Sequence, residues 1–164
     1  MVNKMILGIT GHRPQTLGLD YSYESARYNK LRAIITDKFD ELKPKKIISG
    51  MALGVDTYAV QVALELGIGY IAAVPFEDQE CKWPIKAQKY YCQLLRMADD
   101  VVIVSQGSYS ASKMHTRNRW IVDNSDALLA IFNEQPGSGT ANCVEYAKTK
   151  PSYPIHIINP INIF

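Results

Sequence analysis

Two glycine-rich turns in this sequence have the composition of anion-binding loops. The stretch SGMALGVD contains Ser49, Gly50, Gly54 and Asp56 and stands directly before a segment with the apolar spacing of a helix. Glycine lets the backbone approach a ligand closely, and a helix N-terminus presents free N–H groups to an anion. The turn therefore predicts a phosphate site, although an aspartate in this position is equally suited to capping its own helix.

The second turn precedes a later helix and consists of Gly137, Ser138, Gly139 and Thr140. Neither turn is a Walker loop, because no Gly-Lys-Ser/Thr sequence follows it. Neither turn matches the Gly-x-Gly-x-x-Gly fingerprint of dinucleotide-binding domains. We therefore expect a phosphate-bearing ligand without nicotinamide redox chemistry, and we expect no cofactor.

Polar and aromatic side chains that could contact such a ligand follow other apolar runs of the chain. A guanidinium can pair with a phosphate, an amide or imidazole can bond a sugar, and an indole can stack on a base. The candidates are Gly11, His12 and Arg13 in TGHRP, Gln79 and Trp83 in PFEDQECKW, and His115, Arg117 and Arg119 in MHTRNRW. Trp83 is equally consistent with core packing, and His115 with a surface position at a helix start.

Apolar runs alternate with amphipathic stretches along the whole chain. The runs predict strands over residues 4–10, 45–50, 70–76, 100–105, 127–133 and 154–160. The amphipathic stretches predict helices over residues 24–42, 55–66, 85–97, 114–124 and 140–149. This alternation predicts one domain, residues 1–164, with a Rossmann-like doubly wound α/β fold: a mostly parallel sheet of about six strands with helices on both faces. Such sheets bind ligands beyond the carboxyl ends of their strands, where the candidate residues stand.

The overall composition disfavours several other classes of protein. The formal net charge of +2, from 18 basic and 16 acidic residues, is too small to favour a duplex-DNA binder. Three cysteines without a Cys-x-x-Cys pair predict neither a disulfide framework nor a metal site. The N-terminus lacks the features of a signal peptide, and no apolar run approaches the ~20 residues of a membrane helix. We therefore expect a cytoplasmic protein without membrane contact.

The order of these motifs resembles that of a known family. GHRP, SGMALGVD, PFEDQECKW, RNRWIVDNSDALLAIFN and GSGTANCVEYA look like segments of the YpsA-like proteins, over nearly the whole chain. These proteins belong to the SLOG superfamily, whose members include the LONELY GUY phosphoribohydrolases and the DNA-processing DprA proteins. The resemblance implies a nucleotide or ADP-ribose-like ligand at the glycine turns. It also implies a homo-oligomer, a dimer or larger.

The resemblance to the LONELY GUY enzymes extends to single residues but breaks at one charged position. Their Met-His-x-Arg-Lys motif is matched by Met114, His115 and Arg117, which implies Arg117 as a catalytic residue if this protein is an enzyme. Their Pro-Gly-Gly-x-Gly-Thr-x-x-Glu motif is matched in part, and the place of its glutamate falls on Cys143. A carboxylate stabilises the positive charge that develops when an N-glycosidic bond breaks, and a thiol does not.

Three functions are compatible with these residues. The favoured one is binding of a nucleotide or ADP-ribose-like small molecule, as a sensor or a sequestering protein. The first alternative is hydrolysis of a nucleoside 5′-monophosphate at its glycosidic bond, which the missing glutamate disfavours. The second is DprA-like binding of single-stranded DNA, which needs a basic groove with stacking aromatic side chains. Because the net charge is nearly balanced, we do not expect nucleic acid as a partner.

Overall fold

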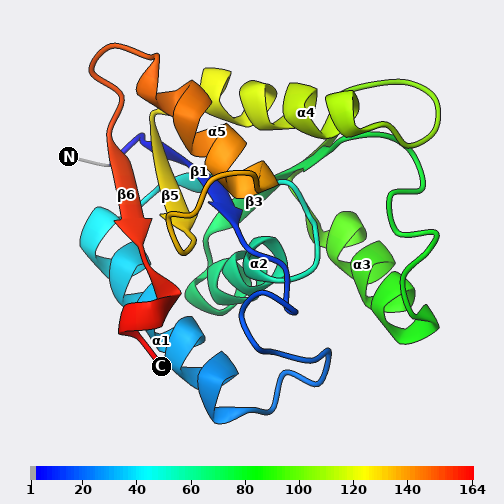
Figure 1. The fold of residues 1–164 in the computed structure, drawn as a ribbon, viewed down its shortest axis with the longest axis horizontal. Coiled ribbons are helices and arrows are strands. Elements are labelled where there is room, and N and C mark those ends of the chain that lie inside the picture. The colour runs from blue at the N-terminus through cyan, green and yellow to red at the C-terminus, as the bar shows by residue number, and fades with distance from the viewer. Residues whose placement is uncertain (1–2) are drawn as a thin grey trace.

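The computed structural model describes residues 3–164, which form a six-stranded sheet with helices packed on it (Figure 1). The strands are β1 (Ile6–Gly11), β2 (Lys46–Ser49), β3 (Gly69–Val74), β4 (Asp100–Ile103), β5 (Ala127–Ile131) and β6 (Ile155–Ile158). Neighbouring strands are parallel throughout, in the order β4-β3-β2-β1-β5-β6. The predicted doubly wound α/β fold is therefore confirmed.

Helices connect the strands, and serine side chains fix where three of them begin. The helices are α1 (Ala26–Leu42), α2 (Val55–Leu66), α3 (Ile85–Met97), α4 (Ala111–Asp123) and α5 (Gly139–Lys148), and a 3-10 turn, η1 (Pro160–Asn162), follows β6. Ser25, Ser110 and Ser138 each accept a hydrogen bond from the backbone N–H three residues further on. Such a cap stabilises a helix by about 1 kcal/mol. The Ser110 cap explains why α4 begins three residues before its predicted start.

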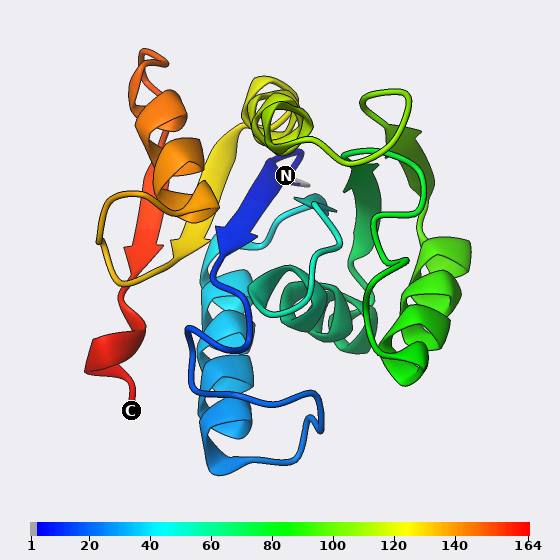
Figure 2. The same cartoon turned by 45° about the vertical axis from the view of Figure 1, so that its right-hand side comes forward.

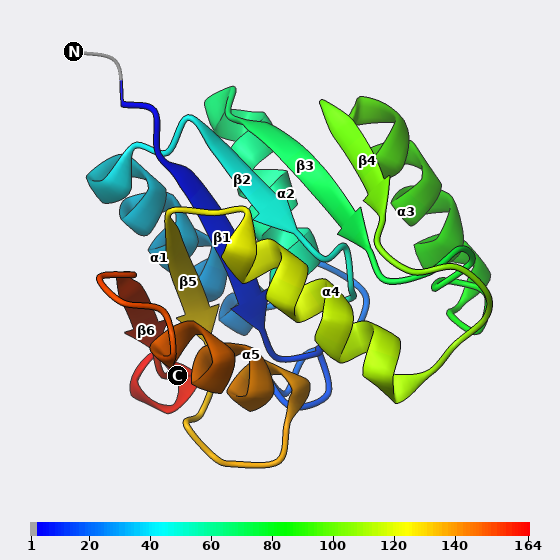
Figure 3. The same cartoon turned by 90° about the horizontal axis from the view of Figure 1, so that it is seen from above.

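The helices cover both faces of the sheet. α1, α2 and α3 pack on one face, and α4 and α5 pack on the other (Figures 2 and 3). This division follows from the right-handed crossovers that join parallel strands. The larger core lies on the first face and includes Leu7, Ile9 and Ile47, whereas a smaller core around Leu128 and Cys143 lies on the second. Strands β4 and β6 form the two edges and are partly exposed.

The order of the strands creates a crevice at the end of β1. From β1 the chain moves outward through β2 and β3 to β4, and it then returns to the other side of β1 with β5. The loops that follow β1 and β5 therefore connect in opposite directions and leave space between them. The two adjacent strand ends are joined by the His12 N–H, which donates to the Ile131 carbonyl at 3.1 Å.

The loop after β1 packs tightly against the N-terminus of α2. The Val55 N–H donates to the His12 carbonyl at 3.2 Å. A Cβ atom at Gly54 would lie 2.9 Å from the Cα atom of Arg13, and one at Gly11 would overlap the Val55 side chain. Gly54 also has a φ of +93°, which residues with a side chain rarely adopt. Both glycines are thus needed for the contact between this loop and α2.

Replacing Gly54 by alanine tests this contact. We expect Gly54→Ala to lower the free energy of unfolding by about 2–6 kcal/mol, because backbone strain and overlap with the loop each cost about 1–3 kcal/mol. Gly137→Ala is the matched control, since Gly137 has a φ of +91° but a Cβ atom there would meet nothing within 4 Å. Urea denaturation measures both variants. Equal losses would contradict the role of packing at Gly54.

Candidate functional site

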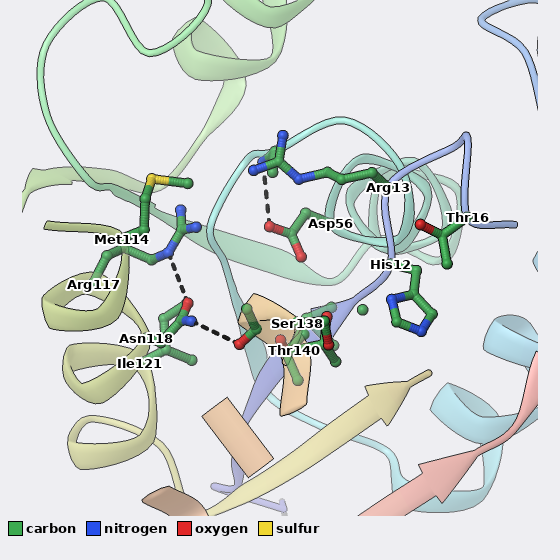
Figure 4. A pocket seen from close by; sticks show the side chains of 15 residues that line it. His12, Arg13, Thr16, Asp56, Met114, Arg117, Asn118, Ile121, Ser138 and Thr140 are labelled. Atoms are coloured by element: carbon green, nitrogen blue, oxygen red, sulfur yellow. Dashed lines mark hydrogen bonds between the residues drawn. The ribbon is translucent and has the colours of Figure 1, made fainter. Parts of the chain in front are cut away.

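A cavity of about 180 Å³ lies at the carboxyl end of β1 (Figure 4). Its walls come from the end of β1 and the loop after it, from the start of α2, from α4 and from the first turn of α5. The lining residues are Ile9, Thr10, Gly11, His12, Arg13, Thr16, Ala52, Asp56, Met114, Arg117, Asn118, Ile121, Ser138, Gly139 and Thr140. Doubly wound sheets bind their ligands at this position.

The side chain of Arg117 reaches the cavity from α4 and is almost fully buried. Its Nη1 donates to the Gly50 carbonyl at 2.7 Å, and its Nε donates to Asn118 Oδ1 at 3.1 Å. Asn118 Nδ2 in turn donates to the Gly139 carbonyl at 3.2 Å. Burial lowers the pKa of Arg117 and the charge of Asp56 opposes that change, while an arginine stays protonated in any case. A chain of hydrogen bonds therefore holds a fixed positive charge between α4, α5 and the loop after β2.

Gly50 separates Arg117 from the carboxylate of Asp56. A Cβ atom at Gly50 would lie 2.6 Å from Arg117 Cζ and 2.8 Å from Asp56 Oδ2, so a larger residue does not fit. The two charges attract each other across this gap, but neither belongs to an ion pair formed within residues 3–164. Both groups therefore keep hydrogen-bonding capacity for a ligand.

Asp56 is the one acidic residue in the described lining of the cavity. Its side chain is buried, and its Oδ2 accepts a hydrogen bond from the Ala52 N–H at 3.2 Å. Burial raises the pKa of Asp56, and the positive charges of Arg117 and Arg13 oppose that rise. Two guanidinium groups against one carboxylate leave the cavity with an excess of positive charge.

His12 connects the two loops that border the cavity. Its Nε2 lies 3.0 Å from the backbone N–H of Asn133 and 3.1 Å from the Oδ1 of the same residue. Its ring meets the ring of Phe132 edge-on, with the two centroids 6.1 Å apart. These contacts hold the imidazole in the wall of the cavity.

The first turn of α5 forms another wall. The Oγ of Ser138 caps the helix by accepting from the Ala141 N–H at 3.0 Å, and Thr140 is buried beside it. The other N–H groups of a first helical turn have no partner within the helix and carry partial positive charge. This end of α5 therefore favours an anion in the cavity.

The structure brings half of the predicted site residues together in this cavity. They are Gly11, His12, Arg13, Asp56, Arg117, Ser138, Gly139 and Thr140. Two more, His115 and Gly137, line an adjoining hollow of about 580 Å³. The hollow shares Ser138 and Gly139 with the cavity, so a single ligand could extend through both.

Other predicted residues support the cavity from behind. Ser49 Oγ donates to the Asp56 carbonyl at 2.9 Å, and Gln79 Nε2 donates to the Gly50 carbonyl at 3.2 Å. Together with Gly54, these residues fix the turn after β2 and do not line the cavity. In this turn the side chains that face the cavity belong to Ala52 and Asp56.

Two predicted residues lie elsewhere. The ring of Trp83 packs edge-on against that of Tyr91, with the centroids 5.2 Å apart. The guanidinium of Arg119 lies 5.7 Å from the centroid of the Tyr146 ring. Neither side chain lines the cavity or the adjoining hollow.

Several lining residues were absent from the prediction, and some of them carry a sequence signal. Met114, Arg117, Asn118 and Ile121 stand three, four and seven residues apart on α4, which places them on one face of the helix. Projecting this helix from Arg117 would have identified Met114, three residues before it, and Ile121, four residues after it. Thr16 has no such signal, because it lies in an irregular loop.

Cys143, at the place of the expected glutamate, is buried beneath the site in the smaller core. Burial raises the pKa of its thiol to about 12. The thiol is therefore uncharged at neutral pH and is a poor nucleophile.

Within residues 3–164 we find no group of three His, Cys, Asp or Glu side chains that could hold a metal ion. In the same part of the chain, no helix is long and apolar enough to cross a membrane.

The burial of Cys143 predicts its reactivity toward a thiol reagent such as Ellman's reagent at pH 8. We expect exposed Cys81 to react fast and Cys143 to react at least about 30-fold more slowly, because the raised pKa of the buried thiol lowers its thiolate fraction and the higher nucleophilicity of that thiolate offsets only about half of the loss on a logarithmic scale. The double variant Cys81→Ser, Cys92→Ser isolates the response of Cys143. A fast reaction of this variant in the folded state would contradict the burial, and full reaction in denaturant is the control.

The chain matches the model of one protein family over most of its length. That family is YpsA, described as the YspA SLOG family, and the match covers residues 7–163. A relative, the UPF0398 protein OB1025 of Oceanobacillus iheyensis, is 30% identical, and the match covers 96% of this chain and 90% of the relative.

Two solved structures share the fold. DNA processing protein A from Helicobacter pylori, described by its single-stranded DNA binding mode, has a TM-score of 0.64 at 18% identity, over 96% of this chain and 70% of that one. The molybdenum cofactor binding protein from Rippkaea orientalis has a TM-score of 0.58 at 18% identity, over 97% of this chain and 78% of that one. At such identities the likeness shows the fold alone. The family match, in contrast, runs through both glycine turns and every wall of the cavity, and the chain belongs to the YpsA family of SLOG proteins.

Proposed function

We propose that this protein binds a nucleotide or ADP-ribose-like small molecule, as a sensor or a sequestering protein, with a phosphate group in the cavity at the carboxyl end of β1. The observation that carries the proposal is that Arg13, Arg117 and the first turn of α5 line one small space. A guanidinium pairs with phosphate through two parallel hydrogen bonds, and a helix N-terminus adds N–H donors. Guanidinium groups and helix N-termini are groups with which proteins commonly bind phosphate.

The two arginines are suited to different parts of that task. Arg117 is held by the Gly50 carbonyl and by Asn118, so its charge is in place before a ligand arrives. Arg13 is exposed and stands on the loop after β1. It is therefore free to close on a bound anion from the solvent side.

The size of the cavity supports a phosphate with a small neighbouring group. Its volume of about 180 Å³ is below the ~300–1,000 Å³ of ordinary small-molecule pockets. The rest of a nucleotide would extend into the adjoining hollow, which is lined by His115, Phe132 and Asn142 among others. The ring of Phe132 and the polar groups beside it suit a base or a second sugar.

Cys143, which stands at the place of the glutamate in the LONELY GUY motif, is consistent with binding of a ligand without its hydrolysis. Cys143 carries a neutral thiol and lies in the smaller core, so it cannot stabilise a positively charged sugar. The hydrolase alternative therefore has no residue at that position to perform its step.

Single-stranded DNA is the alternative ligand that an experiment must compare with small molecules. We did not expect nucleic acid as a partner, but a structural neighbour, the Helicobacter pylori protein, is described by its binding of single-stranded DNA. The Rippkaea neighbour is named for a small molecule, the molybdenum cofactor. A homo-oligomer and a cytoplasmic location also remain our predictions, to be tested by light scattering and cell fractionation.

A ligand panel tests the proposal directly. AMP, ADP, ADP-ribose, cyclic ADP-ribose isomers and a single-stranded oligonucleotide are added to the purified protein and followed by thermal unfolding and calorimetry. At about 100 times its Kd, a true ligand should raise Tm by about 5–10 °C. If none of the small molecules shifts Tm or releases heat, the proposal is wrong. A response to the oligonucleotide alone would favour the DNA-binding alternative.

Replacing Arg13 tests where the phosphate binds. We expect Arg13→Gln to weaken the best ligand of the panel about tenfold or more, because a hydrogen bond to a charged group contributes about 1.5–3 kcal/mol. Arg119→Gln is the matched control, since Arg119 is also an exposed arginine but lies on Tyr146, away from the cavity. Calorimetry should show a change below twofold for the control. Equal effects of the two variants would indicate nonspecific attraction to positive charge.

A further inference from the structure

We infer that Asp56 accepts a hydrogen bond from a ribose hydroxyl of the ligand, so that the site selects ribonucleotides over deoxyribonucleotides. This inference rests on the proposed function and names the class of ligand that the cavity prefers. Nothing in a phosphate site by itself requires a carboxylate. The charge of Asp56 compensates that of Arg117, but the unused acceptor capacity of its carboxylate needs a further explanation.

The carboxylate of Asp56 has hydrogen-bonding capacity that the protein leaves unused. An ionised carboxylate accepts about four hydrogen bonds, and Asp56 accepts one within residues 3–164, from the Ala52 N–H at 3.2 Å. The residue is 7% exposed, so bulk water does not fully replace the missing donors. Such unmet capacity is costly in a buried group unless a ligand or a bound water meets it.

Arg117 does not supply these donors. It lies across Gly50 from Asp56, and its Nη1 is directed to the Gly50 carbonyl at 2.7 Å. Its Nε is directed to Asn118 at 3.1 Å. The protein thus keeps the two opposite charges apart, where a direct ion pair would have filled the space between them. Figure 4 shows both side chains pointing into the same cavity from different walls.

The cavity contains hydrogen-bond donors and one acceptor, so a ligand that fills it must offer both acceptor and donor groups. Arg13, Arg117 and the start of α5 are donors and suit a phosphate. Asp56 is an acceptor and repels a phosphate, so the ligand must place neutral O–H or N–H donors against it. In a 5′-nucleotide the unit next to the phosphate is the ribose, whose 2′ and 3′ hydroxyls are such donors.

The volume of the cavity points to the sugar as the unit that meets Asp56. A space of about 180 Å³ holds the part of the ligand nearest the phosphate, while a base belongs in the larger hollow beyond Ser138 and Gly139. Dinucleotide-binding domains also use an acidic residue to bond ribose hydroxyls. A site built around a hydroxyl discriminates strongly against an analogue without it, because the acceptor is then left unpaired.

The first test compares ligands that differ by one oxygen atom. Calorimetry with the unmodified protein uses AMP, 2′-deoxy-AMP, 3′-deoxy-AMP and inorganic phosphate. We expect AMP to bind at least tenfold tighter, about 1.4 kcal/mol, than the analogue that lacks the accepted hydroxyl. If AMP binds no tighter than either analogue, the inference is wrong. If inorganic phosphate binds in the same experiment, the proposed function still stands.

The second test changes the acceptor. In Asp56→Asn the amide oxygen can keep the bond from the Ala52 N–H, and the NH2 group, a donor, then faces the ligand. We expect AMP to weaken at least tenfold and the AMP preference over the deoxy analogue to fall below threefold. Inorganic phosphate should bind as tightly as before or tighter, because a repelling charge is gone. Glu77→Gln, which removes an exposed carboxylate outside the cavity, should change none of these values.

The outcomes separate the inference from the proposed function. If Asp56→Asn keeps the full preference for AMP over the deoxy analogue, Asp56 does not accept a hydrogen bond from the ribose hydroxyl, and the inference is wrong. Absence of binding by AMP, by both analogues and by phosphate overturns the inference, while the proposed function is decided by the panel that also contains ADP-ribose and its cyclic isomers. The ligand comparison uses the unmodified protein, so a variant that fails to fold leaves that test intact.

Discussion

The buried guanidinium of Arg117 sets the conditions that the rest of the site must meet. Removing such a charge from water costs several kcal/mol unless an opposite charge and hydrogen bonds compensate for the lost hydration. Here the Gly50 carbonyl and the Asn118 side chain accept from the guanidinium, and the charge of Asp56 lies just across Gly50. Gln79 donates to the same Gly50 carbonyl and holds it in place. One buried charge therefore ties together the loop after β2, the start of α2 and the middle of α4.

The architecture could be predicted because its signals are local. In α2, apolar residues recur at helical spacing from Val55 to Leu66, and Gly67, of a type that commonly ends helices, follows in the left-handed conformation. The role of Gly50 could not be predicted in this way. It depends on Arg117, which lies 67 residues further along the chain, and no local pattern reports so distant a contact. The composition of the turn suggested an anion site, whereas its glycines serve in large part to let other groups pack closely.

Helical geometry would have sharpened the prediction of the site. Arg117 and Arg119 were grouped because both are basic, but residues two apart on a helix do not face the same way. The structure has Arg117 in the cavity and Arg119 on Tyr146. The same geometry groups Asn118 with Arg117 on the cavity side, where it bridges to α5. Trp83 is different, because its orientation depends on packing against Tyr91, which the motif alone does not reveal.

The position of the carboxylate bears on whether this cavity holds a ligand or cleaves it. In the LONELY GUY motif the glutamate stands where this chain has Cys143, on the helix after the second glycine turn. The acidic residue that lines the cavity here, Asp56, belongs instead to α2, and Arg117 and Arg13 favour its ionised form while their positive charges offset its field in the cavity. A positively charged sugar gains little from a carboxylate whose field is offset in this way. Under the proposed function, a neutral ribose hydroxyl needs only the lone pairs of Asp56, which the arginines leave free, and we therefore propose that the site holds an intact sugar phosphate and does not cleave it.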